Sequence, residues 1–174
     1  MRLNLPTLIT LSRIIFIPFF VVVTPDRPFL GALIFGIASI TDFLDGYLAR
    51  KTGQITKFGI ILDPIADKFL VISAFILLVD MARLSAWIAI IIIVREFLVT
   101  ALRVVALSKD IVIPAEMGGK LKTFFQITSI LCLIISMNIL GVDLYDVGIV
   151  SIWIALILSI LSGVQYTVSF WRKI

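Results

Sequence analysis

Residues 42–67 read DFLDGYLARKTGQITKFGIILDPIAD, a stretch in which four aspartates interrupt mostly apolar sequence. Asp42 and Asp45 are three residues apart, and Asp63 and Asp67 are four residues apart. On a helix, residues at these spacings lie on one face, so each pair points in one direction. Because a short segment separates the two pairs, the stretch predicts two neighbouring helices that bring four carboxylates to a similar depth.

These four carboxylates cannot all stay ionised side by side in apolar surroundings, because like charges a few ångströms apart repel strongly. Bridging divalent cations would remove this repulsion. The chain has no histidine and a single cysteine, Cys132, so the metal ligands must be carboxylates, which bind hard cations. Mg²⁺ is the first expectation and Mn²⁺ the second, and Mg²⁺ in such sites keeps substrate phosphates among its ligands. The sequence therefore predicts one or two divalent ions and phosphate chemistry.

The rest of the chain is unusually apolar. Apolar residues make up 61% of its 174 residues and charged residues only 15%, against roughly 25% in a soluble domain. A bilayer can solvate so much apolar surface once each backbone polar group is bonded within a helix. The formal charge of +4 comes with no long basic run, so nucleic acid is not an expected partner. The composition predicts an all-α membrane protein.

Six apolar runs approach the roughly 20 residues that a helix needs to cross a bilayer. They lie at residues 7–23, 29–49, 58–79, 85–107, 121–140 and 147–170. No linker separates them, so we expect one domain over residues 1–174, a polytopic bundle of six transmembrane helices. With a cytoplasmic N-terminus, ten Lys and Arg residues fall on that side: Arg2, Arg50, Lys51, Lys57, Arg103, Lys109, Lys120, Lys122, Arg172 and Lys173. Only Arg27 and Arg83 fall on the opposite side of the membrane. Because Lys and Arg are enriched on the cytoplasmic side, this bias predicts that both termini and the aspartates are cytoplasmic.

The spacing Asp42-x2-Asp45-Gly46-x2-Ala49-Arg50-x8-Gly59-x3-Asp63-x3-Asp67 resembles the complete signature of the CDP-alcohol phosphotransferase family. The likeness covers most of the chain and extends to residues 4–13, 58–68, 95–103 and 119–123. In these segments the chain is similar to bacterial members that use sn-glycerol 3-phosphate as acceptor. The resemblance implies six helices around a polar cavity open to the cytoplasm, a place in the bacterial inner membrane, and a homodimer.

The same resemblance implies a reaction of phospholipid biosynthesis. A hydroxyl of sn-glycerol 3-phosphate would attack the β-phosphoryl group of CDP-diacylglycerol, giving phosphatidylglycerophosphate and CMP. Asp42, Asp45, Asp63 and Asp67 would hold a pair of divalent ions, Mg²⁺ or Mn²⁺, on the CDP pyrophosphate, and Asp67 would be the general base. Metal ions suit such a transfer because they neutralise the charge that develops on the phosphoryl oxygens.

Residues for the two substrates follow from the resemblance and from charge. The CDP-diacylglycerol site would be shaped by Gly46, Ala49, Arg50, Thr56, Gly59, Asn4 and Thr7. The acceptor phosphate needs cationic side chains in a cavity rich in carboxylates, and the candidates are Arg103, Lys120 and Lys122. An ordinary role as cytoplasmic flanking charges stays open for these three. Arg95 and Glu96 lie deeper in their apolar run, and we expect them to pair between helices.

Other functions stay open from the sequence alone. Family members with other acceptors, cardiolipin synthase above all, share the donor signature. Membrane prenyltransferases also bind Mg²⁺-diphosphate with paired aspartates, but they are longer and their acidic motifs are widely separated. An ion or proton transporter would spread its acids near the bilayer midplane, whereas these aspartates cluster toward one face.

Overall fold

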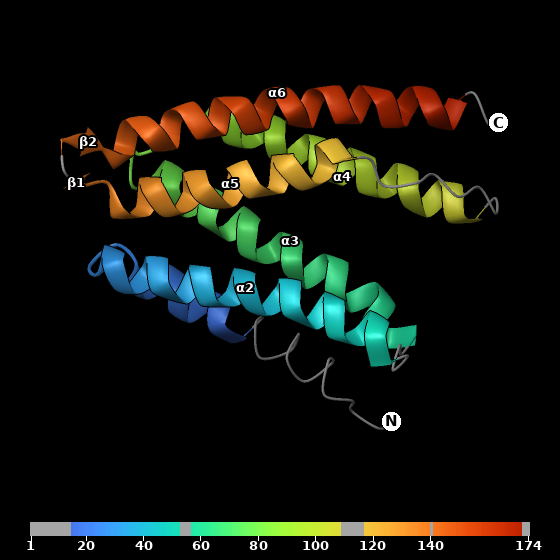
Figure 1. The fold of residues 1–174 in the computed structure, drawn as a ribbon, viewed down its shortest axis with the longest axis horizontal. Coiled ribbons are helices and arrows are strands. Elements are labelled where there is room, and N and C mark those ends of the chain that lie inside the picture. Colours follow the sequence, from blue (N-terminus) through green and yellow to red (C-terminus); the bar gives the residue numbers. More distant parts are fainter. Residues whose placement is uncertain (1–14, 53–56, 109–116, 140, 172–174) are drawn as a thin grey trace. The chain divides into compact units, whose positions relative to one another are not determined.

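The chain is helical almost throughout. The computed structural model describes the backbone of residues 15–52, 57–108, 117–139 and 141–171, and the side chains of these except residues 42–52, 57–67, 103, 107–108 and 117–120. A helix over residues 15–23 is followed by α2 (Pro28–Thr52), α3 (Lys57–Asp80), α4 (Ala86–Ser108), α5 (Met117–Ile135) and α6 (Leu144–Trp171) (Figure 1). The predicted helical character is confirmed.

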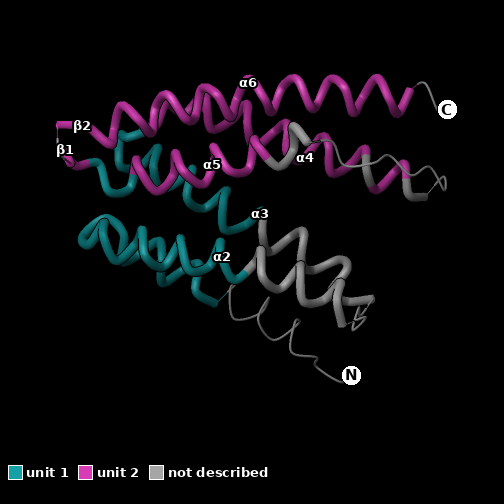
Figure 2. Tube along the Cα trace, in the orientation of Figure 1, with its two compact units in different colours: residues 1–83, 134–136 teal, residues 84–133, 137–174 magenta. Residues whose placement is uncertain are grey.

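The helices belong to two compact units, coloured separately in Figure 2. Unit 1 comprises residues 1–83 and 134–136, and unit 2 comprises residues 84–133 and 137–174. Each unit has its own buried core. The single domain expected over residues 1–174 stays a prediction.

Helix boundaries follow the apolar runs closely for four helices and differ at a fifth. α2, α3, α4 and α6 begin and end within three residues of the runs predicted for them. The fifth run was expected to continue to residue 140, but α5 ends at Ile135. Ser136 has a φ of 43°, a left-handed conformation that cannot continue a right-handed helix. The predicted end of this helix is therefore wrong by about one turn.

A short β-hairpin, which the sequence did not predict, connects α5 to α6. β1 (Asn138–Ile139) pairs antiparallel with β2 (Val142–Asp143), and Asn138 lies opposite Asp143. Gly141 has a φ of 85°, which a residue without Cβ adopts at little cost. Its N–H donates to Oδ1 of Asn138 at 3.0 Å, closing the turn.

α6 is long and apolar enough to cross a membrane, and it is the one helix that meets this test within the described part of the chain. Its most apolar window has a mean hydropathy of 2.5. Its 28 residues measure about 42 Å, more than the roughly 30 Å of a hydrocarbon core. Large apolar side chains are also exposed on other elements, among them Val22 (73%) and Trp87 (75%). A bilayer would solvate this surface; the six transmembrane helices stay a prediction.

Unit 1 packs its first described helix tightly against the start of α2. Phe20 and Phe35 are fully buried, and their ring centroids are 5.8 Å apart. Thr24 is also fully buried, and its hydroxyl donates to the carbonyl of Phe20 at 2.6 Å. A Cβ added to Gly31 would lie 2.7 Å from Cβ of Thr24 and closer still to its hydroxyl oxygen. The contact therefore requires glycine at position 31.

Unit 2 packs α4 and α5 against α6. Ile92, Ile130 and Ile152, one from each helix, are fully buried. The hydroxyl of Ser129 donates to the carbonyl of Gly148 at 2.7 Å, and a Cβ on Gly148 would lie 2.7 Å from Cγ of Leu133. Small residues thus allow α5 and α6 to approach closely, as is typical of helices packed within membranes.

We predict that Gly31→Ala lowers the stability of the protein by about 1–3 kcal/mol, because the added methyl group overpacks a buried contact. The measurement is the thermal unfolding midpoint of the purified protein in detergent. Thr24→Ala removes the hydroxyl oxygen and Cγ2 that the new methyl group would meet but keeps Cβ at 2.7 Å, so the double variant should regain only part of the loss. A Gly31→Ala protein that unfolds at the wild-type temperature would contradict this packing.

Candidate active site

The four aspartates lie on two consecutive helices. α2 runs through Asp42 and Asp45, and α3 runs through Asp63 and Asp67. The helices contact each other, and four residues separate Thr52 from Lys57. Among residues whose side chains are described, no group of three or more His, Cys, Asp or Glu could hold a metal ion. The aspartate side chains lie outside the described residues, so the metal site stays a prediction.

Of the seven residues predicted to bind CDP-diacylglycerol, four belong to α2 or α3 and three lie outside the described residues. Gly46, Ala49 and Arg50 belong to α2, and Gly59 belongs to α3. Asn4, Thr7 and Thr56 lie outside the described residues. Their roles stay predictions.

Of the three cations predicted to bind the acceptor phosphate, only Lys122 has a described side chain. Arg103 belongs to α4 and Lys120 to α5. Lys122 is only 7% exposed, and its Nζ donates to Oε1 of Glu96 on α4. The charge of Lys122 is therefore directed into unit 2.

Glu96 is at the centre of a polar network that joins three helices. Arg95 Nη1 also donates to Glu96 Oε1, at 3.3 Å. On its other side Arg95 reaches α6, where its Nε donates to the carbonyl of Ser159 at 2.6 Å and its Nη2 to the hydroxyl of Ser162. The predicted pairing of Arg95 and Glu96 between helices is thus confirmed.

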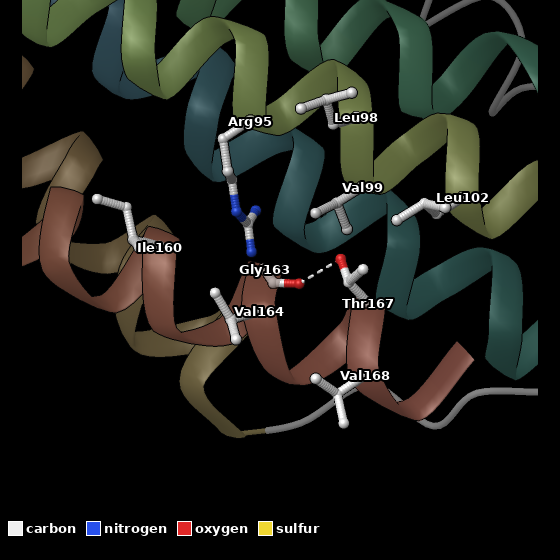
Figure 3. Close-up of a pocket in the computed structure, with 9 residues that line it drawn as sticks. All are labelled: Arg95, Leu98, Val99, Leu102, Ile160, Gly163, Val164, Thr167 and Val168. Carbon is white, nitrogen blue, oxygen red and sulfur yellow. Dashed lines mark hydrogen bonds between the residues drawn. The ribbon is translucent and has the colours of Figure 1, made fainter. Parts of the chain in front are cut away.

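A glycine on α6 gives the network room. A Cβ on Gly163 would lie 3.1 Å from Nε of Arg95, tighter than an ordinary contact. Figure 3 shows the guanidinium of Arg95 extending from α4 toward this part of α6. Because burial of a charge is costly unless the charge is paired and hydrogen-bonded, this crossing explains how Arg95 is tolerated between apolar helices.

Two further buried polar residues were missed by the sequence reading. Gln126 is 4% exposed and Ser159 is fully buried. The Nε2 atom of Gln126 and the hydroxyl of Ser159 have no hydrogen-bond partner among the residues that the structure describes. No sequence signal marked Gln126 as buried, because its position four residues after Lys122 is equally typical of a solvated helix face.

A groove of about 310 Å³ lies between α4 and α6 (Figure 3). Its lining residues are Arg95, Leu98, Val99, Leu102, Ile160, Gly163, Val164, Thr167 and Val168. The walls are apolar, Arg95 is bound to α6, and the hydroxyl of Thr167 donates to the carbonyl of Gly163 at 2.9 Å. Lys122, the one candidate for acceptor binding whose side chain is described, is not among these lining residues.

Comparison with known proteins assigns the family. The sequence model of the CDP-alcohol phosphatidyltransferase family matches residues 3–161. The match includes both aspartate-bearing helices and, of the Glu96 network, Arg95, Glu96, Lys122 and Ser159. The chain belongs to this family and is a transferase. The family is membrane-integral and generally depends on a divalent metal.

Curated bacterial relatives share nearly the whole chain and carry the name CDP-diacylglycerol–glycerol-3-phosphate 3-phosphatidyltransferase. The relative from Bacillus subtilis (strain 168) is 37% identical, with 98% of this chain and 97% of the relative covered. That from Haemophilus influenzae is 41% identical, with 95% and 92% covered. That from Rickettsia bellii (strain RML369-C) is also 41% identical, with 94% and 93% covered.

We predict that Glu96 and Lys122 are energetically coupled. Removing one member of a buried ion pair leaves a buried charge without that partner, so Glu96→Gln and Lys122→Met should each cost about 3 kcal/mol. The double variant should lose less than the sum by at least about 1 kcal/mol, as expected for residues in direct contact. The coupling is measured from the unfolding midpoints of wild type, the two single variants and the double variant. Strictly additive losses would show that the interaction between Glu96 and Lys122 contributes nothing to stability.

Proposed function

We propose that this protein transfers the phosphatidyl group of CDP-diacylglycerol to sn-glycerol 3-phosphate, giving phosphatidylglycerophosphate and CMP. The observation that carries the proposal is near full-length similarity to relatives of that name from distant bacteria, at 37–41% identity. The complete aspartate signature in residues 42–67 supports the donor half of the reaction. The product is a precursor in phospholipid biosynthesis.

The proposed setting is the bacterial inner membrane, with six transmembrane helices forming one domain around a cavity that opens to the cytoplasm. The length and apolarity of α6 support a membrane position, and so do the exposed apolar side chains. The family match runs through residues of both compact units, which supports one functional domain. The excess of Lys and Arg at one set of helix ends supports cytoplasmic termini, and a homodimer is proposed by family resemblance.

In the proposed metal site, Asp42, Asp45, Asp63 and Asp67 hold two divalent ions, Mg²⁺ or Mn²⁺. Asp45 lies seven residues before the end of α2, and Asp63 lies six residues after the start of α3. In a hairpin of two helices these positions fall at a similar level, about 10 Å from the connection, with Asp42 and Asp67 about one turn beyond. The donor set consists only of carboxylates, which fits hard divalent cations.

The proposed mechanism assigns the proton to Asp67. Its carboxylate accepts the proton of the attacking hydroxyl, whose oxygen forms a bond to the β-phosphorus of CDP-diacylglycerol. The bond from this phosphorus to the bridging oxygen breaks, and CMP leaves with that oxygen. Divalent ions, when bound, would neutralise negative charge on the pyrophosphate. Gly46, Ala49, Arg50, Thr56 and Gly59, with Asn4 and Thr7, orient the donor.

The acceptor phosphate is proposed to bind the cations of α4 and α5. Arg103 and Lys120 lie near the cytoplasmic ends of their helices in the proposed topology, where a dianionic phosphate would arrive. Lys122 is held by Glu96, so we propose that it contributes its positive charge to this region from within unit 2.

The test is CMP release by the purified protein in detergent with CDP-diacylglycerol and Mg²⁺. Glycerol 3-phosphate, phosphatidylglycerol, serine and inositol phosphate are offered in separate reactions, and each is repeated with Mn²⁺. We expect release only with glycerol 3-phosphate, and loss of release when the metal is chelated. Release with phosphatidylglycerol instead would identify a cardiolipin synthase and overturn the proposed acceptor.

We predict that Asp67→Asn abolishes CMP release while the protein stays folded, since asparagine neither accepts the proton nor binds a cation as a carboxylate does. A matched control is Asp80→Asn, which changes an exposed carboxylate at the other end of the same helix. The control should keep full activity. An active Asp67→Asn enzyme would exclude Asp67 as the general base.

A further inference from the structure

α5 ends where its own sequence gives little reason to end. Ser136, the residue after its last one, has a φ of 43°, and serine adopts this left-handed conformation at a cost that glycine does not have. Glycine, the residue that most often ends a helix in this conformation, comes only at Gly141, and three of the four residues between are apolar. The local sequence therefore favours a helix that continues to Leu140.

The side chain of Arg83 supplies a reason from elsewhere in the chain. Its Nη1 atom donates to the carbonyl of Ile134, in the last turn of α5. In a continuous helix that carbonyl would accept from the N–H of Asn138, four residues later. Asn138 instead belongs to β1. Arg83 thus replaces the backbone donor that the break removes.

The charge of Arg83 suits this place as well as its hydrogen bond does. The C-terminal end of a helix carries a partial negative charge, so a cation there is stabilising. Ile134 is fully buried and Arg83 is half-buried, and a charge-assisted hydrogen bond is stronger in such surroundings than in water. Both residues belong to unit 1, so the bond lies within one compact unit.

The backbone of the same arginine closes the end of α3. Ala82, the residue before it, also has a left-handed φ, of 55°. The N–H of Arg83 donates to the carbonyl of Leu78 at 2.9 Å, and that of Ala82 donates to the carbonyl of Val79 at 3.0 Å. These are the paired bonds of a Schellman motif, which hold the backbone of Arg83 at a fixed place. The ends of α3 and α5 are therefore both bound by one residue.

We propose that Arg83 is a clamp that sets the length of α5 by selecting between two conformations of residues 136–140. With the clamp, α5 breaks at Ser136 and its 19 residues measure about 28 Å, close to the roughly 30 Å of a hydrocarbon core. Without the clamp, the helix continues to Leu140, measures about 36 Å, and ends at Gly141. Residues 141–143 then connect it to α6, since about two to five residues suffice between antiparallel helices.

This role accounts for an arginine at a position that the charge bias predicts to be external, where cations are few. The positive charge is retained there because it binds the end of a helix. The inference does not depend on which acceptor the enzyme uses.

The test measures the backbone conformation at Asn138. Asn138-Ile139 is the only Asn-Ile pair in the chain, so asparagine labelled with ¹³C at the carbonyl and isoleucine labelled with ¹⁵N give one NMR signal for this peptide bond. Its carbonyl shift separates strand from helix, and wild type in detergent should show a strand. Arg83→Met keeps an apolar stem without a donor, and it should move the shift into the helical range. Arg27→Met, which removes an exposed cation also predicted to be external, should leave the shift unchanged.

Two double variants separate the clamp from a general loss of packing. Glycine adopts the left-handed conformation at little cost, so a break at position 136 then needs no compensation. Arg83→Met combined with Ser136→Gly should therefore keep the strand shift. Ala82→Gly relaxes the same conformation at the end of α3, and it should not restore the strand shift in Arg83→Met.

Each outcome decides for or against the clamp. A strand shift in Arg83→Met, a helical shift in wild type, or a changed shift in Arg27→Met would overturn it. If Arg83→Met does not fold, Ser136→Gly should restore folding and Ala82→Gly should not; any other result of this pair would overturn the clamp as well. CMP release is not part of the measurement, so a folded but inactive wild type would overturn the proposed function and leave the clamp in place.

Discussion

Glu96 is the charge on which the arrangement of unit 2 depends. A carboxylate between apolar helices is tolerated only when it is paired and hydrogen-bonded, and Glu96 is bound by both Arg95 and Lys122. Arg95 uses its other donors on the carbonyl of Ser159 and the hydroxyl of Ser162. These bonds have directions, whereas apolar contact has none. They therefore fix which faces of α4, α5 and α6 meet.

Close approach of the helices is the second condition for this network. Gly163 lets the Arg95 guanidinium lie against α6, and Gly148 lets Leu133 and Ser129 of α5 reach the start of that helix. Lipid tails are as apolar as leucine, so helices in a bilayer gain little from apolar burial and associate through tight packing and hydrogen bonds. The glycines and serines of unit 2 supply both, which fits a family that is membrane-integral.

The sequence predicted the helices better than the breaks between them. Apolar runs of the right length gave α2, α3, α4 and α6 to within three residues, because a chain in a bilayer must close its backbone hydrogen bonds within each helix. The end of α5 was not predictable in this way, since Met137, Ile139 and Leu140 keep the sequence largely apolar beyond it and the break depends on the φ of Ser136. The β-hairpin that follows depends in the same way on one backbone angle, the φ of 85° at Gly141.

Within the candidate site, the sequence predicted residue types more reliably than the directions of side chains. The aspartate signature led to the correct family because its chemistry is local to residues 42–67. The direction of Lys122 was out of reach, because it depends on Glu96, 26 residues earlier on another helix. The burial of Gln126 was equally out of reach, because a glutamine four residues after a lysine is as common on a solvated helix face as inside a bundle.

Division of the proposed site residues between the two units bears on how the family varies its acceptor. All residues proposed to bind the donor or the metal belong to unit 1, and Arg103, Lys120 and Lys122, proposed for the acceptor, belong to unit 2. The donor pyrophosphate demands carboxylates and divalent cations, whereas the acceptor phosphate demands cationic side chains. Because these opposite demands fall on different helices, substitutions on α4 and α5 can alter the acceptor while residues 42–67 keep the donor chemistry. One signature can then serve enzymes that differ only in the alcohol they use.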